Sequence, residues 1–398
     1  MDLIETCRRA PAALRRAFAA VALTTIALTS AQAAGQCSVL ASDLLKPAGS
    51  ALTPLGALLV AESGTRTPNT GRISIVSTEG VRRTLLDGLP SGIADVGDVS
   101  GPSGMVLRGR TLYLLVSVGD VGVAGPAPGT VLANPAGPSS PLMSSLIAIH
   151  FSAAAEKAGA SFALTLENHQ RIAAGETVEL DGPGGGISVR RVADFPNSIP
   201  FPLPMLPANL KLSNPFALAL RGDLAFVTDG GRNLVWRVEL DTGAVEPLVS
   251  FPNIPNPLFG QAPGGPFTEA VPTGIATQGD SLLVALFRGA PFAPGTSTIQ
   301  RVHPVTAADE TLIAGMKTLI GVLPLGGTRG LLVLQHASAP APFFAGPGRV
   351  LRYRDPAAAP EVVADCLERP VAMTLDSKGG RLLVTDFIGR LVAVPFQP

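Results

Sequence analysis

The chain has 398 residues, and its 30 basic and 30 acidic side chains give a formal net charge of zero. That balance indicates neither a nucleic-acid partner nor an anionic membrane surface, because both are recognised through an excess of positive charge. Only 15% of the residues are charged, whereas 44 glycines and 37 prolines supply many turns. Apolar residues occur in strand-length runs between these turns. The composition therefore predicts an all-β protein, and closed β folds of this length are ordinary single domains.

Residues 1–33 resemble an export signal. Four arginines precede an uncharged, alanine-rich run over residues 17–31, and Ala31-Gln32-Ala33 matches a signal-peptidase site. The run is short for a retained membrane anchor. General secretion is favoured over twin-arginine export, because the residues that flank Arg15-Arg16 depart from that pattern. The sequence predicts a bacterial protein exported to the periplasm or the extracellular space, with a mature domain over residues 34–398 and no membrane insertion after signal removal.

Residues 213–249 are the clearest repeat unit of that domain. Apolar runs over residues 216–220, 224–228, 233–240 and 245–249 are separated by turns rich in glycine and aspartate. Four short strands joined by such turns predict an antiparallel meander. A single meander has two apolar faces, so it needs further copies against which to pack.

Five more units carry the same signature, in which X-Pro-x-(Gly or Ala) is followed by a turn and a leucine-rich strand. They are marked by Lys46-Pro47, Gly101-Pro102, Val271-Pro272, Arg369-Pro370 and a copy with Ile320 in place of proline. Six such units predict a six-bladed β-propeller. The last unit, residues 369–398, supplies only three strands, whereas residues 37–42 form a spare strand. We therefore expect the N- and C-terminal strands to pair in one blade and close the ring.

The mature chain keeps two cysteines, Cys37 and Cys366, and an even pair favours a disulfide in an exported protein. In the predicted ring, however, Cys37 begins one outer strand and Cys366 ends its neighbour. That arrangement puts them at opposite faces, and a disulfide requires Cα atoms that lie close together. Both alternatives, bridged and free, stay open.

The two faces of the predicted ring differ in loop length. One face has short turns, apart from an insert over residues 152–175 in the second unit. The other face has long loops rich in proline, glycine and phenylalanine, which cover residues 119–141, 195–212, 251–270, 288–296 and 337–348. Binding residues gather on long loops of rigid scaffolds. The candidate contacts for a ligand or partner are Phe267, Arg288, Phe292, His336, Phe343 and Phe344. The competing interpretation is that these phenylalanines pack loop against loop.

Four segments give the mature chain a family resemblance: residues 213–243, 269–276, 286–295 and 369–391. Over these segments and most of the mature domain, the chain resembles the ScyD/ScyE family of exported β-propellers, whose repeat is shared with NHL-type propellers. The resemblance implies a six-bladed ring. It implies no defined biochemical activity.

Acidic residues that end second strands are the best candidates for chemistry. The four histidines lack metal-ligand spacing with one another, and no nucleophile elbow or paired-cysteine motif occurs. Gluconolactonase–regucalcin propellers place a divalent cation such as Ca²⁺ on acids and asparagines at the channel mouth. The matching set here is Glu62, Asn214, Asp229 and Asp386. A structural role competes with this, because hairpin geometry puts Lys46 beside Glu62 and Arg369 beside Asp386.

The sequence thus favours a monomeric binding or scaffold protein that takes a partly apolar small molecule or a protein partner, without a cofactor. The alternative function is a divalent-cation-dependent hydrolase or lactonase. The residues indicate no catalytic group for the first function.

Overall fold

The computed structural model describes residues 36–157, 159–182 and 184–398, which belong to one compact unit. The predicted export signal, residues 1–33, lies outside the described residues. The described part of the chain forms six sheets that each contain four antiparallel strands. Two of these sheets carry a fifth strand at the edge. Each sheet is one blade of a six-bladed β-propeller, as the repeat predicted.

The first three blades follow one another along the chain. Blade 1 contains β2 (Pro47–Leu52), β3 (Leu58–Glu62), β4 (Gly71–Val76) and β5 (Arg82–Leu89). Blade 2 contains β8 (Pro102–Arg108), β9 (Thr111–Val116), β12 (Ser145–Phe151) and β15 (Gly185–Asp194). Blade 3 contains β18 (Pro215–Arg221), β19 (Leu224–Asp229), β20 (Leu234–Glu239) and β21 (Val245–Ser250).

The remaining blades complete the ring. Blade 4 contains β24 (Pro272–Gln278), β25 (Ser281–Leu286), β26 (Ser297–Val302) and β27 (Asp309–Met316). Blade 5 contains β28 (Leu319–Pro324), β29 (Leu331–Gln335), β30 (Gly348–Tyr353) and β31 (Glu361–Leu367). Blade 6 contains β32 (Pro370–Asp376), β33 (Arg381–Asp386), β34 (Arg390–Pro395) and, from the other end of the chain, β1 (Ser38–Ala41).

The repeat signature marks the strands that line the ring axis. The innermost strands β2, β8, β18, β24, β28 and β32 each contact the next, and β32 contacts β2. Proline begins five of these six strands, where the missing N–H breaks no ladder bond. Leu319, rather than Ile320, takes the place of proline in blade 5. The glycine of the signature allows close approach, since a Cβ on Gly104 would lie 2.5 Å from the carbonyl oxygen of Phe216 in the next blade.

The ring closes as expected from the missing and spare strands. β1 pairs with β34 in antiparallel register, with Ser38 opposite Ala393 and Val39 opposite Val392. The two ends of the propeller domain are thereby hydrogen-bonded in one sheet, and blade 6 has no missing outer strand.

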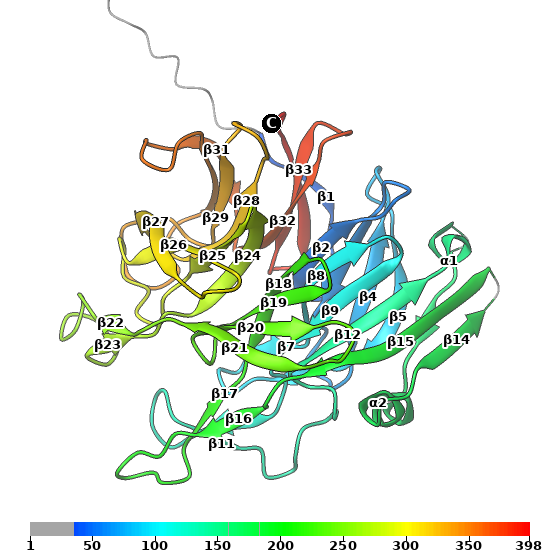
Figure 1. The fold of residues 1–398 in the computed structure, drawn as a ribbon, viewed down its shortest axis with the longest axis horizontal. Coiled ribbons are helices and arrows are strands. Elements are labelled where there is room, and N and C mark those ends of the chain that lie inside the picture. Colours follow the sequence, from blue (N-terminus) through cyan, green and yellow to red (C-terminus); the bar gives the residue numbers. More distant parts are fainter. Residues whose placement is uncertain (1–35, 158, 183) are drawn as a thin grey trace, which may run out of the picture. The chain divides into compact units, whose positions relative to one another are not determined.

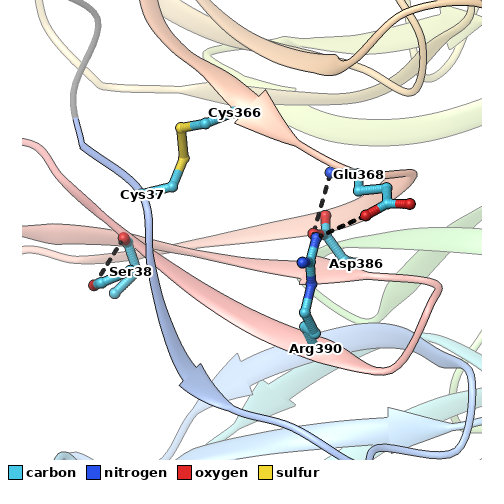
Figure 2. The surroundings of a disulfide bond; sticks show 7 residues. Cys37, Ser38, Cys366, Glu368, Asp386 and Arg390 are labelled. Atoms are coloured by element: carbon cyan, nitrogen blue, oxygen red, sulfur yellow. Dashed lines mark hydrogen bonds and ion pairs between the residues drawn. A yellow bond between two sulfur atoms is a disulfide. The ribbon is translucent and has the colours of Figure 1, made fainter.

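A disulfide joins Cys37, just before β1, to Cys366 in β31 of the neighbouring blade, with 6.1 Å between their Cα atoms (Figure 2). The expectation that the two cysteines lie at opposite faces was wrong. Neighbouring strands of a sheet rotate by about 20–25°, so three steps from the first to the fourth strand accumulate roughly 60–75°. Outer strands consequently run around the ring rather than along its axis. The end of one outer strand then approaches the beginning of the next.

The insert between β12 and β15 extends the scaffold of the first two blades. It contains α1 (Ala153–Lys157), β13 (Phe162–Ala163), α2 (Leu166–Ala173) and β14 (Val178–Gly182). β14 forms a hairpin with β15 (Figure 1), whereas β13 adds to the outer edge of blade 1 in parallel with β5. The side chain of Thr165 caps α2.

Short hairpins form in segments that connect strands or blades. They are β6–β7 (Gly92–Ile93 and Val99–Ser100), β10–β11 (Gly122–Ala124 and Val131–Ala133), β16–β17 (Ser198–Pro200 and Leu210–Leu212) and β22–β23 (Ile254–Pro255 and Phe267–Thr268). The hairpins provide hydrogen-bond partners for backbone N–H and C=O groups of segments that lie outside the blades.

The hydrophobic core lies between adjacent blades. Trp236 of blade 3 packs against Phe195 at the end of blade 2, with 6.0 Å between ring centroids, and both side chains are buried. Leu115 and Val227 belong to the same apolar cluster. Each blade thus packs its apolar faces against the neighbouring blades, which a single meander could not do. Among the described residues, no helix is long and apolar enough to span a membrane.

Candidate functional site: an aromatic cluster on blades 4 and 5

Two loops meet where blades 4 and 5 adjoin. Both connect the second strand of a blade to the third, so ladder direction puts them on the same face of the ring. The first joins β25 to β26, and the second joins β29 to β30. The backbone N–H of Phe343 in the second loop donates to the carbonyl oxygen of Pro291 in the first, at 2.8 Å. The two loops therefore hold each other in place.

Five aromatic side chains gather at this junction: Phe287, Phe292, His336, Phe343 and Phe344. We call them the aromatic cluster. Phe292 and Phe344 are stacked with 4.5 Å between centroids, and His336 meets Phe344 edge-on at 5.0 Å. Offset stacks and edge-to-face pairs are the arrangements that aromatic quadrupoles prefer. The rings therefore stabilise the loop conformation.

The aromatic cluster has a buried base and an exposed rim. Phe287 and His336 are buried, whereas Phe343 is 41% exposed and Phe344 is 37% exposed. Phe292 and Phe343 have positive φ angles of 56° and 57°, which are unfavourable for bulky side chains. Strained residues of this kind gather at binding sites, where the surrounding structure holds them. Both the exposure and the backbone thus mark these loops as a candidate site.

His336 is a neutral member of the cluster. Its Nδ1–H donates to the carbonyl oxygen of Pro370 at 3.0 Å. Burial lowers the pKa of His336 to about 4, although the bond to Pro370 opposes that effect and the nearby charge of Arg369 adds to it. The imidazole is therefore uncharged at neutral pH, and its Nε2 carries a lone pair.

Two cations hold the second loop through its backbone. Arg369 donates from Nη2 to the carbonyl oxygen of Phe344 at 2.5 Å and from Nη1 to that of Gly346 at 3.2 Å. Its guanidinium carbon lies 5.7 Å from the centroid of the Phe344 ring. Lys317 donates from Nζ to two further carbonyl oxygens of the same loop, at 2.9 and 2.6 Å. Burial lowers the pKa of Lys317, and the charge of Arg369 lowers it further.

The six residues predicted as contacts are placed unevenly. Phe292, His336, Phe343 and Phe344 lie together in the aromatic cluster. Phe267 lies apart on β23, where it is 61% exposed and has no ring partner among the described residues. Arg288 directs its Nε to the carbonyl oxygen of Thr296 at 3.1 Å, and its Nη1 is buried without a hydrogen-bond partner. Burial lowers the pKa of Arg288.

Sequence reasoning did not select Phe287, Lys317 or Arg369 for this site. Phe287 follows β25 directly, at a position that a repeat pattern assigns to the core. Lys317 and Arg369 precede first strands of blades 5 and 6, so their proximity to the loop depends on how neighbouring blades pack. No local sequence signal carries that information.

The acids considered for a cation site serve their own blades instead. Glu62, Asp229 and Asp386 are all fully buried. Each accepts a backbone N–H from the segment before the first strand: that of Leu45, Asn214 and Glu368, respectively. Each also accepts a donor from the third strand: Arg72 at 2.7 Å, the indole of Trp236 at 3.0 Å and Arg390 at 2.8 Å. Figure 2 shows the arrangement around Asp386.

The predicted pairs Lys46–Glu62 and Arg369–Asp386 were wrong. Lys46 pairs with Asp98 at 3.4 Å and lies over the ring of Phe387, while Arg369 binds loop carbonyls. Register explains the difference, because Arg72 lies directly opposite Glu62 in the ladder and Arg390 lies opposite Asp386. Lys46 and Arg369 occupy positive-φ turns before their strands, at 55° and 56°, rather than extended hairpin positions.

These residues do not fit a metal site. Within the described ranges, no group of three His, Cys, Asp or Glu side chains is placed to hold a metal ion. Each of the three carboxylates accepts hydrogen bonds from its own blade, with Oδ1 of Asp386 left unpartnered. Asn214 accepts a hydrogen bond from Ser117 through its side-chain oxygen. A cation at Glu62, Asn214, Asp229 and Asp386 would require these bonds to be broken.

Comparison with known proteins establishes the fold. No protein-family model matches the chain, and no curated protein matches it. The PQQ-bound aldose sugar dehydrogenase from Streptomyces coelicolor is similar in structure with a TM-score of 0.50 and 13% identity, covering 91% of this chain and 98% of that one. A gluconolactonase from Xanthomonas campestris has a TM-score of 0.47 and 12% identity, covering 91% and 89%. A Bacteroides thetaiotaomicron protein of unknown function has a TM-score of 0.49 and 9% identity, covering 91% and 76%. At 13% identity, the likeness to the dehydrogenase shows a shared fold alone.

Proposed function

We propose that this protein is an exported β-propeller that binds a partly apolar small molecule on the aromatic cluster. The exposed rims of Phe343 and Phe344 above a buried aromatic base are the observation that carries the proposal. Fully internal packing would cover these rings. Aromatic surface left open on a well-hydrogen-bonded loop is typical of a binding site.

Preorganisation supports the same function. The loop between β29 and β30 is held by the N–H of Phe343, by Arg369 and by Lys317 before any ligand arrives. A ligand that stacks on these rings therefore loses little affinity to loop ordering.

Export and family membership are part of the proposal. The Cys37–Cys366 disulfide supports an oxidising compartment, where such bonds persist. The resemblance to the ScyD/ScyE family agrees with an exported propeller. A lactonase function lacks comparable support, because the acids that it would use already bond to their own blades.

The test uses a neutral aromatic probe, N-phenyl-1-naphthylamine, whose fluorescence rises in apolar sites. We expect Phe343→Ser with Phe344→Ser to weaken its binding about tenfold or more, since two aromatic contacts of roughly 1 kcal/mol each are lost. Phe259→Ser is the matched control, because Phe259 is 58% exposed on a different loop. Equal loss in both variants, or no saturable binding to the wild-type protein, contradicts the proposal.

A further inference from the structure

An ion pair at the end of the second strand is present in blades 1 and 6 and absent in blade 5. In blade 1 the last residue of the second strand, Glu62, lies opposite Arg72 and forms an ion pair with it at 2.7 Å. Asp386 and Arg390 repeat this pair in blade 6 at 2.8 Å. In blade 5 the arginine is present as Arg349, but the residue opposite it is Gln335.

Gln335 still forms a hydrogen bond to the segment before the first strand, as Glu62 does in blade 1, but it carries no negative charge. Gln335 donates from Nε2 to the carbonyl oxygen of Lys317, in the segment before the first strand. The carboxylate of Glu62 binds the N–H of Leu45 at the corresponding place in blade 1. Arg349 therefore keeps a positive charge with no carboxylate opposite it in the ladder.

Three more cations near the aromatic cluster also lack a carboxylate partner. None of Arg288, Lys317, Arg349 and Arg369 forms an ion pair with any described carboxylate. Lys317 is only 4% exposed, and burial of an unneutralised ammonium is costly.

Holding the loop does not account for all four charges. Arg369 and Lys317 do bind loop carbonyls, but a guanidinium has five N–H donors, of which Arg369 uses two. Arg288 is buried and leaves Nη1 without a hydrogen-bond partner, and Arg349 has no carboxylate opposite it. An anionic ligand would supply the negative charge that the described carboxylates do not bring to these four cations.

We propose that the aromatic cluster binds a small aromatic anion of the carboxylate or sulfonate class. The inference rests on the proposed binding function and specifies its ligand. The ring of the ligand lies against Phe343 and Phe344, and its charged group is directed to Arg369, the cation beside the exposed Phe344 ring. Planar guanidinium donors match the geometry of an oxyanion. Lys317 and Arg349 add to the positive potential at the site.

The test compares two probes that differ by one sulfonate group, 8-anilino-1-naphthalenesulfonate and N-phenyl-1-naphthylamine. We expect the wild-type protein at low salt to bind the sulfonate at least about tenfold more tightly, as a hydrogen bond to a charged group contributes roughly that factor. Arg369→Gln removes this preference, whereas Arg369→Lys retains most of it. Arg354→Gln is the charge control, because Arg354 is an exposed cation that follows β30 of blade 5, at the end of that strand remote from the loop between β29 and β30.

The outcomes separate the two proposals. If neither probe binds saturably, both the binding function and the anion inference fail. If both probes bind equally, or Arg369→Gln keeps the sulfonate preference, the binding function stands and the inference fails. If Arg369→Gln loses the neutral probe as well, the loop has been disrupted and Arg349→Gln decides instead. In that variant a reduced sulfonate preference supports the inference, and an unchanged preference overturns it.

Discussion

His336 illustrates at the residue scale how burial selects a charge state. The imidazole donates to the carbonyl oxygen of Pro370 and lies among aromatic rings, so protonation would place a charge where water is excluded. A neutral imidazole can pack against a stacked aromatic ligand, and His336 stays uncharged near neutral pH.

Stability should fall in acid because of His336. Its pKa drops from 6.5 to about 4 on folding. Between these values the unfolded chain binds more protons than the folded one, so the free energy of unfolding decreases as pH falls through this window. His336 accounts for about 3 kcal/mol of that decrease at the low end. Burial also lowers the pKa of His169, which adds in the same direction.

The measurement is urea denaturation at several pH values between about 4 and 7. His336→Asn keeps a donor near the position of Nδ1 but cannot titrate. We expect this variant to reduce the change in the free energy of unfolding between about pH 7 and pH 4 by up to about 3 kcal/mol. His303→Asn, at an exposed histidine outside the aromatic cluster, is the comparison variant. An identical profile for His336→Asn and wild type would show that His336 titrates normally in the folded protein.

At the scale of single elements, a buried acid organises each of three blades. Glu62 connects three segments of blade 1, because it accepts from Leu45 before β2, from Ser74 and Arg72 on β4, and itself ends β3. The same geometry recurs at Asp386 and, with Trp236 as the donor, at Asp229. These side chains fix how the strands of a hairpin meet at the loop-rich face.

Removing such an acid should destabilise the fold. We expect Glu62→Ala to lower the free energy of unfolding by roughly 3 kcal/mol, since it leaves the half-buried Arg72 and the donors of Leu45 and Ser74 unpaired. The comparison variant is Glu361→Ala, which breaks the exposed pair with Arg354 and should cost less than about 1 kcal/mol. Denaturant unfolding with and without Ca²⁺ measures both. A stable Glu62→Ala protein that loses a Ca²⁺-dependent stabilisation would instead restore the cation hypothesis.

At the scale of the whole molecule, closure of the ring depends on two contacts near the N-terminus. β1 completes blade 6, and Cys37 links that strand to blade 5 across 329 residues of sequence. The hydrogen bonds close the ring within one sheet, while the disulfide connects that sheet to its neighbour. A propeller opened at this point would expose the edge of β34.

Loss of the disulfide should therefore weaken the whole ring. We expect Cys37→Ser with Cys366→Ser to lower the free energy of unfolding by roughly 2–5 kcal/mol, as for a cross-link that closes a long loop. Thermal unfolding with and without reductant tests this. Reductant should lower the Tm of the wild-type protein to that of the double variant and leave the variant unchanged. A wild-type Tm that does not respond to reductant, although the thiols have been freed, would contradict this role.

The sequence by itself determined the propeller, its blade number and its closure. Each blade is a meander whose turns and alternation lie within short stretches, such as residues 213–249, so local chemistry is sufficient to reveal it. Counting strands in the sequence also shows that the last unit, from residue 369, lacks one strand and that residues 37–42 form a spare strand. Phe292, Phe343 and Phe344 were also recognisable as loop residues of one face.

Only the tertiary structure decided which side chains became partners. Cys37 meets Cys366 because sheet twist turns the outer strands around the ring, and Glu62 meets Arg72 rather than Lys46 because of ladder register and a positive-φ turn. Phe287, Lys317 and Arg369 join the aromatic cluster because blades 4, 5 and 6 pack side by side. Contacts of this kind depend on angles between strands and between blades, which accumulate over the whole sheet and leave no signal in a local sequence pattern.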